Sequence, residues 1–574
     1  MVDLWSNQSS SSDTSRFFHR PPWKVAWGKV GSVSGDAVWS DDCIAIFVPS
    51  QPVLSPSQRF VLIGDAWLPT ASELLQKLGK HSPEWQGNSL FLISQLWEQY
   101  GTDTWGMLVG AFSLVVWDRD QKVLWLGRDR AGAYTLYYTP DGSLRWAASQ
   151  LRTLTEHCSP NLDLVALRDY LCCAFVPGER TLWQPIREVR PGTCVNLGEG
   201  RTQVYWQLQE AITGADQPLE WHGHRLRSLL NSVIQDHLPK GEPVGVFLSG
   251  GLDSSCVTAL AAMVHDAPIH TYSIHFGADC PNELEFSSQV AKYWQTKHHI
   301  LEISFRAMWE QLPAAIAHLD DPIGDPLTVP NLLLGQLARQ SVRVVLNGEG
   351  GDPCFGGPKN QPMLIHALYG TTSQQDLLSA YLVSFQKCAS DLSQLLKPEI
   401  WSAVQAEPSV FSDDLYSSIR YLNRLMALNI KFKGADHILT KVNNLTRAAG
   451  LEGRSPLFDS RVVELSMQIP PEYKLSGVQE KAVLKQAVAD LLPESIINRP
   501  KSGMMVPVQL GFRQYWNRQA KALLTDRKAA IAPYLNQTLI RDWLNYQGDT
   551  WHRYGVKLWL LVSLELWLQS NGFR

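Results

Sequence analysis

A run of small and polar residues follows a short apolar stretch near the middle of the chain. The apolar stretch is residues 244–248, and an apolar segment with helical spacing continues to about residue 264. Between them stands Ser249-Gly250-Gly251-Leu252-Asp253-Ser254-Ser255. Two glycines let the backbone approach an anion closely, and N–H groups at a helix start point toward that anion. With serine hydroxyls as further donors, the sequence predicts a phosphate-binding loop between a strand and a helix.

The carboxylate in this loop predicts a metal ion. Asp253 would repel a phosphate unless a cation lay between them, and Mg²⁺ binds carboxylates together with phosphate oxygens. The chain has no GxxxxGK[ST] motif, which excludes a Walker-type loop. The competing interpretation is a glycine turn that only joins strand to helix. The complete seven-residue run in this setting argues against it.

The segments around the loop alternate between strand and helix patterns. This alternation indicates a parallel sheet with crossover helices, followed by a mainly helical region beyond residue 379. The predicted strands are residues 244–248, 269–274, 299–303 and 342–346. The predicted helices run to residue 264 and over 283–294 and 329–338.

The first part of the chain has a different pattern, with short alternating apolar segments broken by Gly, Pro and Asp. It predicts antiparallel sheets, with strands at 45–48, 60–63, 111–117 and 123–127. Residues 90–100 have helical spacing and stop at Gly101. We therefore divide the chain into a flexible polar arm (1–22), a first domain (23–210) and a second domain (222–574), separated by a polar segment.

Composition narrows the partners and the compartment. The formal net charge of the 574 residues is -4, which gives no global reason to bind nucleic acid or an anionic membrane. The N-terminus lacks the pattern of a secretory signal. The best candidate for a membrane span, residues 558–568, is short and contains Glu565. We expect a soluble cytoplasmic protein without stable membrane insertion.

The phosphate loop resembles the signature of PP-loop ATP pyrophosphatases, which cleave ATP between the α- and β-phosphates and adenylate their substrate. Further segments resemble asparagine synthetase-like proteins, and the resemblance covers nearly the whole chain. These segments are Leu346-Asn347-Gly348-Glu349-Gly350-Gly351-Asp352, Phe355-Gly356-Gly357, Asp320-Asp321-Pro322-Ile323-Gly324-Asp325-Pro326, Gly450-Leu451-Glu452-Gly453-Arg454-Ser455-Pro456-Leu457-Phe458-Asp459 and Arg499-Pro500-Lys501-Ser502-Gly503.

The resemblance implies ATP and Mg²⁺ as cofactors and assigns roles to individual residues. Asp253 and Asp352 would bind Mg²⁺, while Lys501, Glu349 and Glu283 would act in catalysis. The residues implied to bind ATP or pyrophosphate are Leu248, Ser249, Gly250, Gly251, Leu252, Asp253, Ser254, Ser255, Ile274 and Gly348. Of these, Leu248 and Ile274 would frame the adenine.

Several of these assignments have a simpler alternative. Lys501 can be an ordinary surface lysine, and a glutamate at a helix start such as Glu283 has its own favourable dipole interaction. Buried ion pairs that shape the fold would account equally well for Arg454, Asp320, Asp325 and Asp459. Substrate specificity is expected in the helical C-terminal region, around Asn443, Asn444 and Arg447.

The first domain resembles the glutaminase domain of the same proteins. The matching segments are residues 105–113, 116–118, 127–130, 136–138, 175–182 and 190–193. The resemblance implies a glutaminase-like antiparallel αββα sandwich, followed by a C-terminal parallel-sheet PP-loop synthetase domain with a helical extension. The chain is thus of the α/β and α+β class.

The glutaminase chemistry looks lost. A working domain of this kind uses a cysteine exposed as the mature N-terminus, whose own amine is the base. Position 2 is Val2, and Cys43 lies within an apolar strand. The oxyanion-hole Asn–Gly pair aligns with Ile63-Gly64, and the acidic residue that grips glutamine aligns near Ser89. We expect no glutamine hydrolysis, which leaves the domain as a structural element or a docking surface.

The amine must then come from elsewhere. Lasso-peptide cyclases resemble this chain in length and in a degenerate N-terminal domain. They adenylate an Asp or Glu side chain of a leaderless peptide, whose N-terminal amine closes a macrolactam, and this is our preferred hypothesis. The implied partners are that peptide, a leader peptidase and a leader-binding protein.

Three alternatives remain open at this point. They are asparagine synthesis from free ammonia, a β-lactam or carbapenam synthetase-like reaction, and a non-catalytic ATP-binding scaffold. Glu349 is the asparagine synthetase choice at a position where the β-lactam and carbapenam enzymes carry Tyr.

Overall fold

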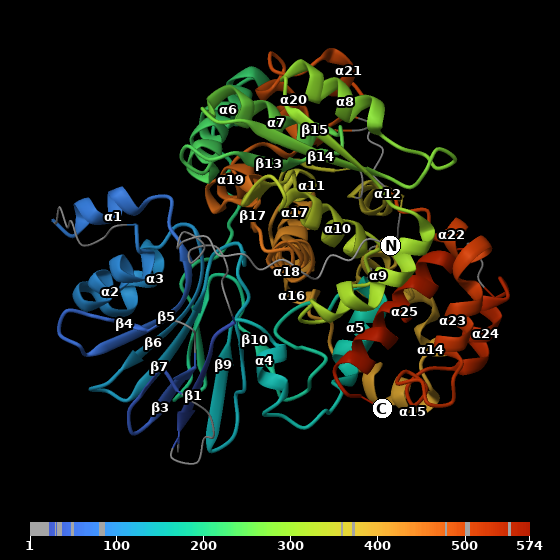
Figure 1. Cartoon of the computed structure of the whole chain (residues 1–574), viewed down its shortest axis with the longest axis horizontal. Coiled ribbons are helices and arrows are strands. Elements are labelled where there is room, and N and C mark those ends of the chain that lie inside the picture. The colour runs from blue at the N-terminus through green and yellow to red at the C-terminus, as the bar shows by residue number, and fades with distance from the viewer. Residues whose placement is uncertain are drawn as a thin grey trace, which may run out of the picture.

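The computed structural model describes residues 22–28, 30, 37–47, 51–79, 87–357, 360–369, 374–476, 479–499, 505–548 and 553–573. The predicted polar arm lies outside these ranges except for Pro22. Figure 1 shows a sheet-rich N-terminal half, in blue and cyan, beside a larger half that runs from green to red.

Two antiparallel six-stranded sheets face each other in the N-terminal half. The first has the order β10 (Arg187–Glu188), β8 (Tyr137–Tyr138), β9 (Leu144–Ala148), β1 (Lys24–Gly28), β3 (Ile44–Phe47), β2 (Trp39–Ser40). The second has the order β12 (Arg201–Val204), β11 (Thr193–Asn196), β7 (Val123–Arg128), β6 (Ala111–Asp118), β5 (Phe60–Trp67), β4 (Val53–Leu54).

Alternating apolar residues explain why these strands form a sandwich. Val25 and Ile44 of the first sheet pack in one buried cluster with Ile63 and Val115 of the second. Helices α1 (Ala71–Lys77), α2 (Ser89–Tyr100) and α3 (Thr104–Met107) cover the outer face of the second sheet (Figure 1). Helices α4 (Arg152–Thr155) and α5 (Leu164–Cys173) lie on the side of the first sheet. The predicted αββα sandwich is confirmed.

The second half is built on a parallel sheet in the order β15-β14-β13-β16-β17. Its strands are β13 (Val244–Phe247), β14 (Ile269–His275), β15 (Lys297–Glu302), β16 (Val344–Leu346) and β17 (Glu452–Arg454). The helices around it include α6 (Leu219–His237), α7 (Leu252–Val264), α8 (Leu284–Tyr293), α9 (Phe305–Ala317) and α10 (Thr328–Ala338). The predicted α/β alternation is confirmed.

The structure differs from the sequence-based prediction at several strands. β5 continues four residues past its predicted end, and β16 begins two residues after its predicted start. β15 begins two residues before its predicted start, because the exposed Lys297 and the partly exposed His298 at the sheet edge lack the apolar pattern of a buried strand. β17 falls in a region predicted as mainly helical. It has three residues, two of them charged, and therefore lacks the apolar pattern that marks a buried strand.

The helical extension packs against this sheet and the helices around it. Its elements include α11 (Gly351–Phe355), α12 (Gln361–Tyr369), α13 (Gln374–Ser384), α14 (Leu392–Leu395), α15 (Pro398–Val404), α17 (Tyr421–Leu428), the π-helix η6 (Asn429–Leu439), α18 (Thr440–Ala448), α19 (Ser460–Ser466), α20 (Ala482–Ala487), α23 (Asn517–Leu524), α24 (Gln537–Leu544) and α25 (Tyr554–Ser570).

One hydrophobic cluster joins the two halves. It contains Ala26 of β1 and Tyr170 of α5 together with Trp559 and Leu561 of α25. The hydroxyl of Tyr170 donates to the carbonyl of Leu560 at 2.9 Å, and Figure 1 shows α5 beside α25. The N-terminal half is therefore packed into the rest of the molecule through its core.

Helix α25 contains the segment that came closest to a membrane span in the sequence. Its Glu565 is fully buried and accepts the backbone N–H groups of Ala530 and Ile531, each at 2.9 Å. Across the described ranges, no helix combines the length and the apolarity that crossing a membrane requires.

Candidate active site

The phosphate loop lies where the sequence predicts it, between the end of β13 and the start of α7. Gly250 has φ +80°, and a Cβ there would lie 2.5 Å from the backbone N of Ser287. Only glycine fits both the conformation and the space. The loop therefore passes directly against the start of α8 and leads into the N-terminus of a thirteen-residue helix.

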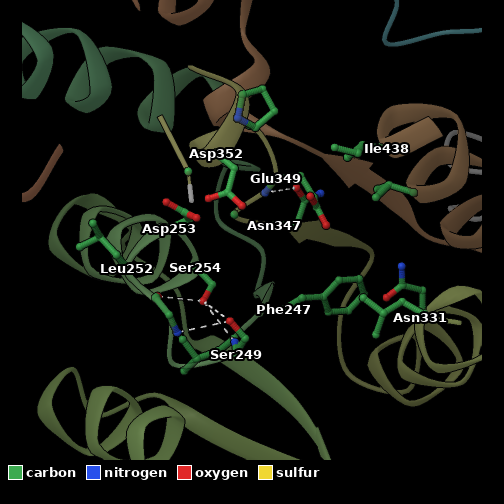
Figure 2. Close-up of a pocket in the computed structure, with 18 of the residues that line it drawn as sticks. Phe247, Ser249, Leu252, Asp253, Ser254, Asn331, Asn347, Glu349, Asp352 and Ile438 are labelled. Carbon is green, nitrogen blue, oxygen red and sulfur yellow. Dashed lines mark hydrogen bonds between the residues drawn. The ribbon is translucent and has the colours of Figure 1, made fainter. Parts of the chain in front are cut away.

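The serine hydroxyls of the loop hold each other in place. The Oγ atoms of Ser249 and Ser254 lie 3.1 Å apart, and the Ser254 hydroxyl donates to the carbonyl of Gly251 at 3.2 Å (Figure 2). Both residues line a cavity, as do Leu248, Gly251 and Leu252. Ser255 does not line that cavity, because the next position along a helix turns its fully buried side chain toward the core.

A second loop joins β16 to α11 and brings another carboxylate to the same place. The loop carries Gly348 and Glu349, and Asp352 follows in the first turn of α11; all three line the cavity. A Cβ on Gly351 would lie 2.1 Å from Oδ1 of Asp253. Glycine at this position leaves room for Asp253 to approach the second loop, and Figure 2 shows the Asp253 and Asp352 carboxylates turned toward the same space.

Lys481 lies between these two carboxylates. Its Nζ is 2.6 Å from Oδ2 of Asp253 and 2.5 Å from Oδ1 of Asp352. The residue precedes α20 with φ 54° and is almost fully buried. Burial disfavours its charge, but attraction to Asp253 and Asp352 outweighs burial and raises the pKa of Lys481. A permanent ammonium group therefore faces the position predicted for phosphate.

The cavity extends well beyond the phosphate loop, with a volume of about 350 Å³. Its lining includes Leu248 and Ile274, which the resemblance implies would frame the adenine, together with Tyr272. It also includes Asp325 and Lys441, which form a close ion pair. We call the lining around this ion pair the polar end of the cavity.

Of the two predicted catalytic residues Glu283 and Lys501, the structure describes only Glu283. Glu283 lines the cavity and is paired with Arg499, whose guanidinium also donates to the carbonyl of Gly250 at 3.2 Å. This pairing links the start of α8 to the phosphate loop. Lys501 belongs to residues 500–504, which lie outside the described residues.

Most of the other motif residues hold the fold together away from the cavity. Asp459 is paired with Arg461 and His237, which hold its pKa well below the usual value despite burial. Asp320 accepts an N–H bond from Asn444 at 3.0 Å, and Arg454 is paired with Glu452. Of the four motif residues for which the sequence also allowed a purely structural role, Asp325 lines the cavity.

The positions that the sequence suggested for substrate specificity do not line the cavity. The side-chain amide of Asn444 donates to Asp320, and that of Asn443 donates to the carbonyl of Ala133. Their neighbours on α18 line the cavity instead, because that face of the helix is turned toward it. These neighbours are Lys441, Val442, Leu445 and Thr446.

The donor set fits a magnesium ion that arrives with a nucleotide. Within the described ranges, no group of three or more His, Cys, Asp or Glu residues could hold a metal ion by itself. Mg²⁺ in nucleotide sites commonly uses one or two carboxylates plus phosphate oxygens. Asp253 and Asp352 could supply those carboxylates, and the ion would neutralise phosphate charge.

Comparison with known protein families shows the family of this chain. The asparagine synthase family matches residues 225–569, which is more than half of the chain. The chain belongs to the asparagine synthase family. It is therefore an asparagine synthetase-like, ATP-dependent carbon–nitrogen ligase. The glutamine amidotransferase domain family matches residues 45–206.

Two asparagine synthetases are similar to this chain over most of its length. Asparagine synthetase [glutamine-hydrolyzing] 1 of Bacillus subtilis (strain 168) is 25% identical over 517 residues, covering 83% of this chain and 80% of that protein. Asparagine synthetase [glutamine-hydrolyzing] 3 of the same organism is 27% identical, covering 77% and 75%. Glutamine phosphoribosylpyrophosphate amidotransferase from B. subtilis aligns with a TM-score of 0.22 at 12% identity, covering 62% of this chain and 86% of that one.

Sequence reasoning missed Lys481. The residue stands in the run Glu480-Lys481-Ala482-Val483-Leu484, where nothing resembles a ligand-binding loop. The available signal was a lysine that opens an apolar helical stretch, because burying an unpaired ammonium is costly. Such a position predicts a buried carboxylate partner without saying which one.

At the two positions that the resemblance aligns with the glutaminase oxyanion and glutamine-binding residues, the first domain has a core residue and a helix-start residue. Ile63 lies within β5 and is 5% exposed, so its side chain belongs to the sandwich core. Ser89 is the first residue of α2. Cys43 stands just before β3, not inside it, with its backbone N–H bonded to Asp41 Oδ1 at 3.0 Å and its carbonyl to Gly28.

Proposed function

We propose that this ligase adenylates a carboxylate of a peptide and lets the amino terminus of the same peptide capture it as a macrolactam. The observation that carries the proposal is the contrast between the two sites. The Asp253–Lys481–Asp352 arrangement equips the synthetase cavity for ATP chemistry. Ile63 fills the position where a glutaminase would need a polar donor.

The reaction has two steps with different demands. The carboxylate oxygen attacks the α-phosphorus of ATP, the bond to the bridging oxygen breaks, and pyrophosphate leaves with the electron pair. The amine nitrogen then attacks the acyl carbon, the bond to AMP breaks, and the nitrogen loses its surplus proton. Lys481 is placed to neutralise the negative charge that builds up on the phosphate and acyl oxygens.

The polar end of the cavity suits a charged substrate. The buried Lys441 forms an ion pair there with the partly buried Asp325. Burial opposes the Lys441 charge, while Asp325 and Glu349 raise the pKa of Lys441. Fixed charges of both signs suit a substrate that carries both an amine and a carboxylate.

The test is a pyrophosphate-release assay with ATP and Mg²⁺ and three alternative substrate sets. These are a leaderless precursor peptide with an Asp or Glu inside a plausible ring, aspartate with ammonium, and aspartate with glutamine. We expect pyrophosphate release with the peptide and a product lighter by one water by mass spectrometry. An Asp253→Asn variant should give neither signal.

Each alternative function predicts a different result in this assay. Asparagine formed from aspartate and ammonium, with no peptide product, would replace the proposal by ammonia-dependent asparagine synthesis. Turnover that requires glutamine would show that the N-terminal half is active, against the proposal. Pyrophosphate release with none of the substrate sets, although the protein binds ATP, would favour a binding scaffold.

A further inference from the structure

One wall of the synthetase cavity is the π-helix η6, which runs for eleven residues and continues into α18. Asn429, Lys433, His437 and Lys441 line the cavity at steps of four residues along this wall. π-Helices are rare and occur mostly as single-turn bulges, often at functional sites. A π-helix of this length therefore depends on contacts with its surroundings.

The glutaminase-like half provides such contacts through Asp436. The guanidinium of Arg190 donates to Oδ1 of Asp436 at 2.7 Å, and the N–H of Gly178 donates to Oδ2 at 2.8 Å. A second nitrogen of Arg190 donates to the carbonyl of Lys431 at 3.1 Å. Arg190 therefore binds the helix at two points about one turn apart. The Asp436 side chain is 1% exposed, so these charge-assisted bonds are little weakened by water.

The residue after Asp436 faces the cavity. Nε2 of His437 lies 3.2 Å from Oδ2 of Asp325, the same carboxylate oxygen that pairs with Lys441. The His437 ring stacks on Phe175 of the glutaminase-like half, with centroids 5.3 Å apart and planes 9° apart. Burial lowers the pKa of His437 to about 4, so the stacked ring is uncharged near neutral pH. Anchoring Asp436 thus fixes His437 and, through Asp325, the Lys441 ammonium.

The opposite side of this polar end is tied to the same half. Asp320 and Asp321 precede Asp325 in one short segment and accept the backbone N–H groups of Leu151 and Leu182, each at 2.9 Å. The segment that contains Asp325 and the helix that leads to Lys441 are therefore both hydrogen-bonded to the glutaminase-like half.

We propose that the glutaminase-like half acts as a clamp that positions the substrate wall of the synthetase cavity, with Arg190 as its positioning residue. The inference rests on the proposed function, because it takes the polar end of the cavity as the place where the carboxylate substrate binds. It gives the degenerate half a task that needs no glutamine chemistry. The nucleotide end is held by other elements and does not depend on Arg190.

The experiment compares Arg190→Ala with Arg130→Ala in the full chain. Arg130 also pairs across the halves, with Glu464 at 2.9 Å, but Glu464 lies on α19 and does not line the cavity. In the pyrophosphate-release assay, we expect Arg190→Ala to raise the KM for the carboxylate substrate about tenfold or more. The KM for ATP should stay within about twofold. Arg130→Ala should change neither.

Three further variants separate positioning from a general loss of stability. Asp436→Asn should reproduce the Arg190→Ala effect, and the double variant should add little, because the two residues act as one unit. Arg190→Lys should have a KM for the carboxylate substrate between those of Arg190→Ala and wild type, since it keeps the charge but not the two-point contact. Equal KM changes in Arg190→Ala and Arg130→Ala would overturn the proposal.

Hydrogen exchange tests the clamp without any substrate. Residues 429–439 should exchange faster in Arg190→Ala than in Arg130→Ala. Unchanged exchange in Arg190→Ala would overturn the clamp, whatever the substrate is. If no substrate supports turnover, the proposed function fails while the exchange result still decides for or against the clamp.

Discussion

The Nζ atom of Lys481 lies 2.6 Å from Oδ2 of Asp253, although 228 residues separate the two in the sequence. The same atom contacts Asp352, so one ammonium group joins the starts of three helices, α7, α11 and α20. Two carboxylates held this close would repel each other without a cation. Lys481 therefore both permits the arrangement and supplies positive charge beside the phosphate loop.

Replacing Lys481 by Met should reduce the rate of pyrophosphate release by about 10²- to 10³-fold, as removal of a charge-stabilising donor does in other active sites. The thermal midpoint should also fall, because Asp253 and Asp352 then face each other uncompensated. Lys481→Arg keeps the charge in a larger, planar group and should stay well below wild type. Single-turnover kinetics provide the measurement, and a rate within threefold of wild type in Lys481→Met would remove this residue from the mechanism.

Gly351→Ala should lower activity by about tenfold or more, because a misplaced reacting group can reduce the rate by about 10²-fold. The new methyl group would lie 2.1 Å from the Asp253 carboxylate, which must then move. Gly106→Ala is the matched control, since a Cβ at Gly106 meets no atom within 4 Å. Steady-state kinetics of the two variants side by side test the prediction. Equal activity would mean that the position of Asp253 is not critical.

Stability should rise between pH 7 and pH 9 because of Lys474. Burial lowers its pKa to about 7 from the usual 10.5. Above pH 7 the folded protein holds fewer protons at this group than the unfolded chain, so raising the pH favours folding by about 2 kcal/mol over this interval. The gain should be complete only above the unfolded pKa and absent below pH 7.

Urea unfolding of wild type and Lys474→Met at pH 7 and pH 9 measures this contribution. The increase with pH should be smaller in the variant. Lys474→Met also leaves the side-chain oxygen of Asn423 and the carbonyl of Ser466 without their donor, so its stability at a single pH is not informative. An identical pH dependence in both proteins would show that Lys474 stays charged when buried.

We expect Ile63→Asn not to restore glutamine hydrolysis, because the sequence analysis predicts the loss of the nucleophile as well as of the oxyanion donor. It should lower the free energy of unfolding by about 2 kcal/mol, since it places an amide in the sandwich core. Ile63→Val keeps the core apolar and should cost about 1 kcal/mol. Glutamate release from glutamine is the assay, and a measurable rate in Ile63→Asn would show that a usable nucleophile is still present.

The sequence was most informative where function depends on neighbouring residues. The phosphate loop, its strand and its helix are contiguous, so their order and glycines predict both local structure and ligand. The alternating strands of the sandwich could be predicted for the same reason. Asp352 was predicted because its segment also ends a strand in glycines and carboxylates, and the structure brings it to the same lysine as Asp253.

The sequence was least informative where the site depends on tertiary packing. Lys481 reaches the carboxylates from a helix start with no pattern of its own, and only the packing of α20 against α6 and its neighbours brings it there. Helical phase decides that Lys441 faces the cavity while Asn443 and Asn444 do not. β17 was missed because three residues carry too little pattern to distinguish a strand.

The hydrophobic cluster shared by both halves has a consequence for the amount of ligase in a cell. A chain cut near residue 210 would leave the apolar surface of α25 without the cover that Tyr170 and its neighbours provide, and such surfaces promote aggregation. Substitutions that loosen the glutaminase-like half should likewise expose the whole protein to proteolysis. Mutations far from any ATP contact would then lower ligase abundance without changing the specific activity of the molecules that remain folded.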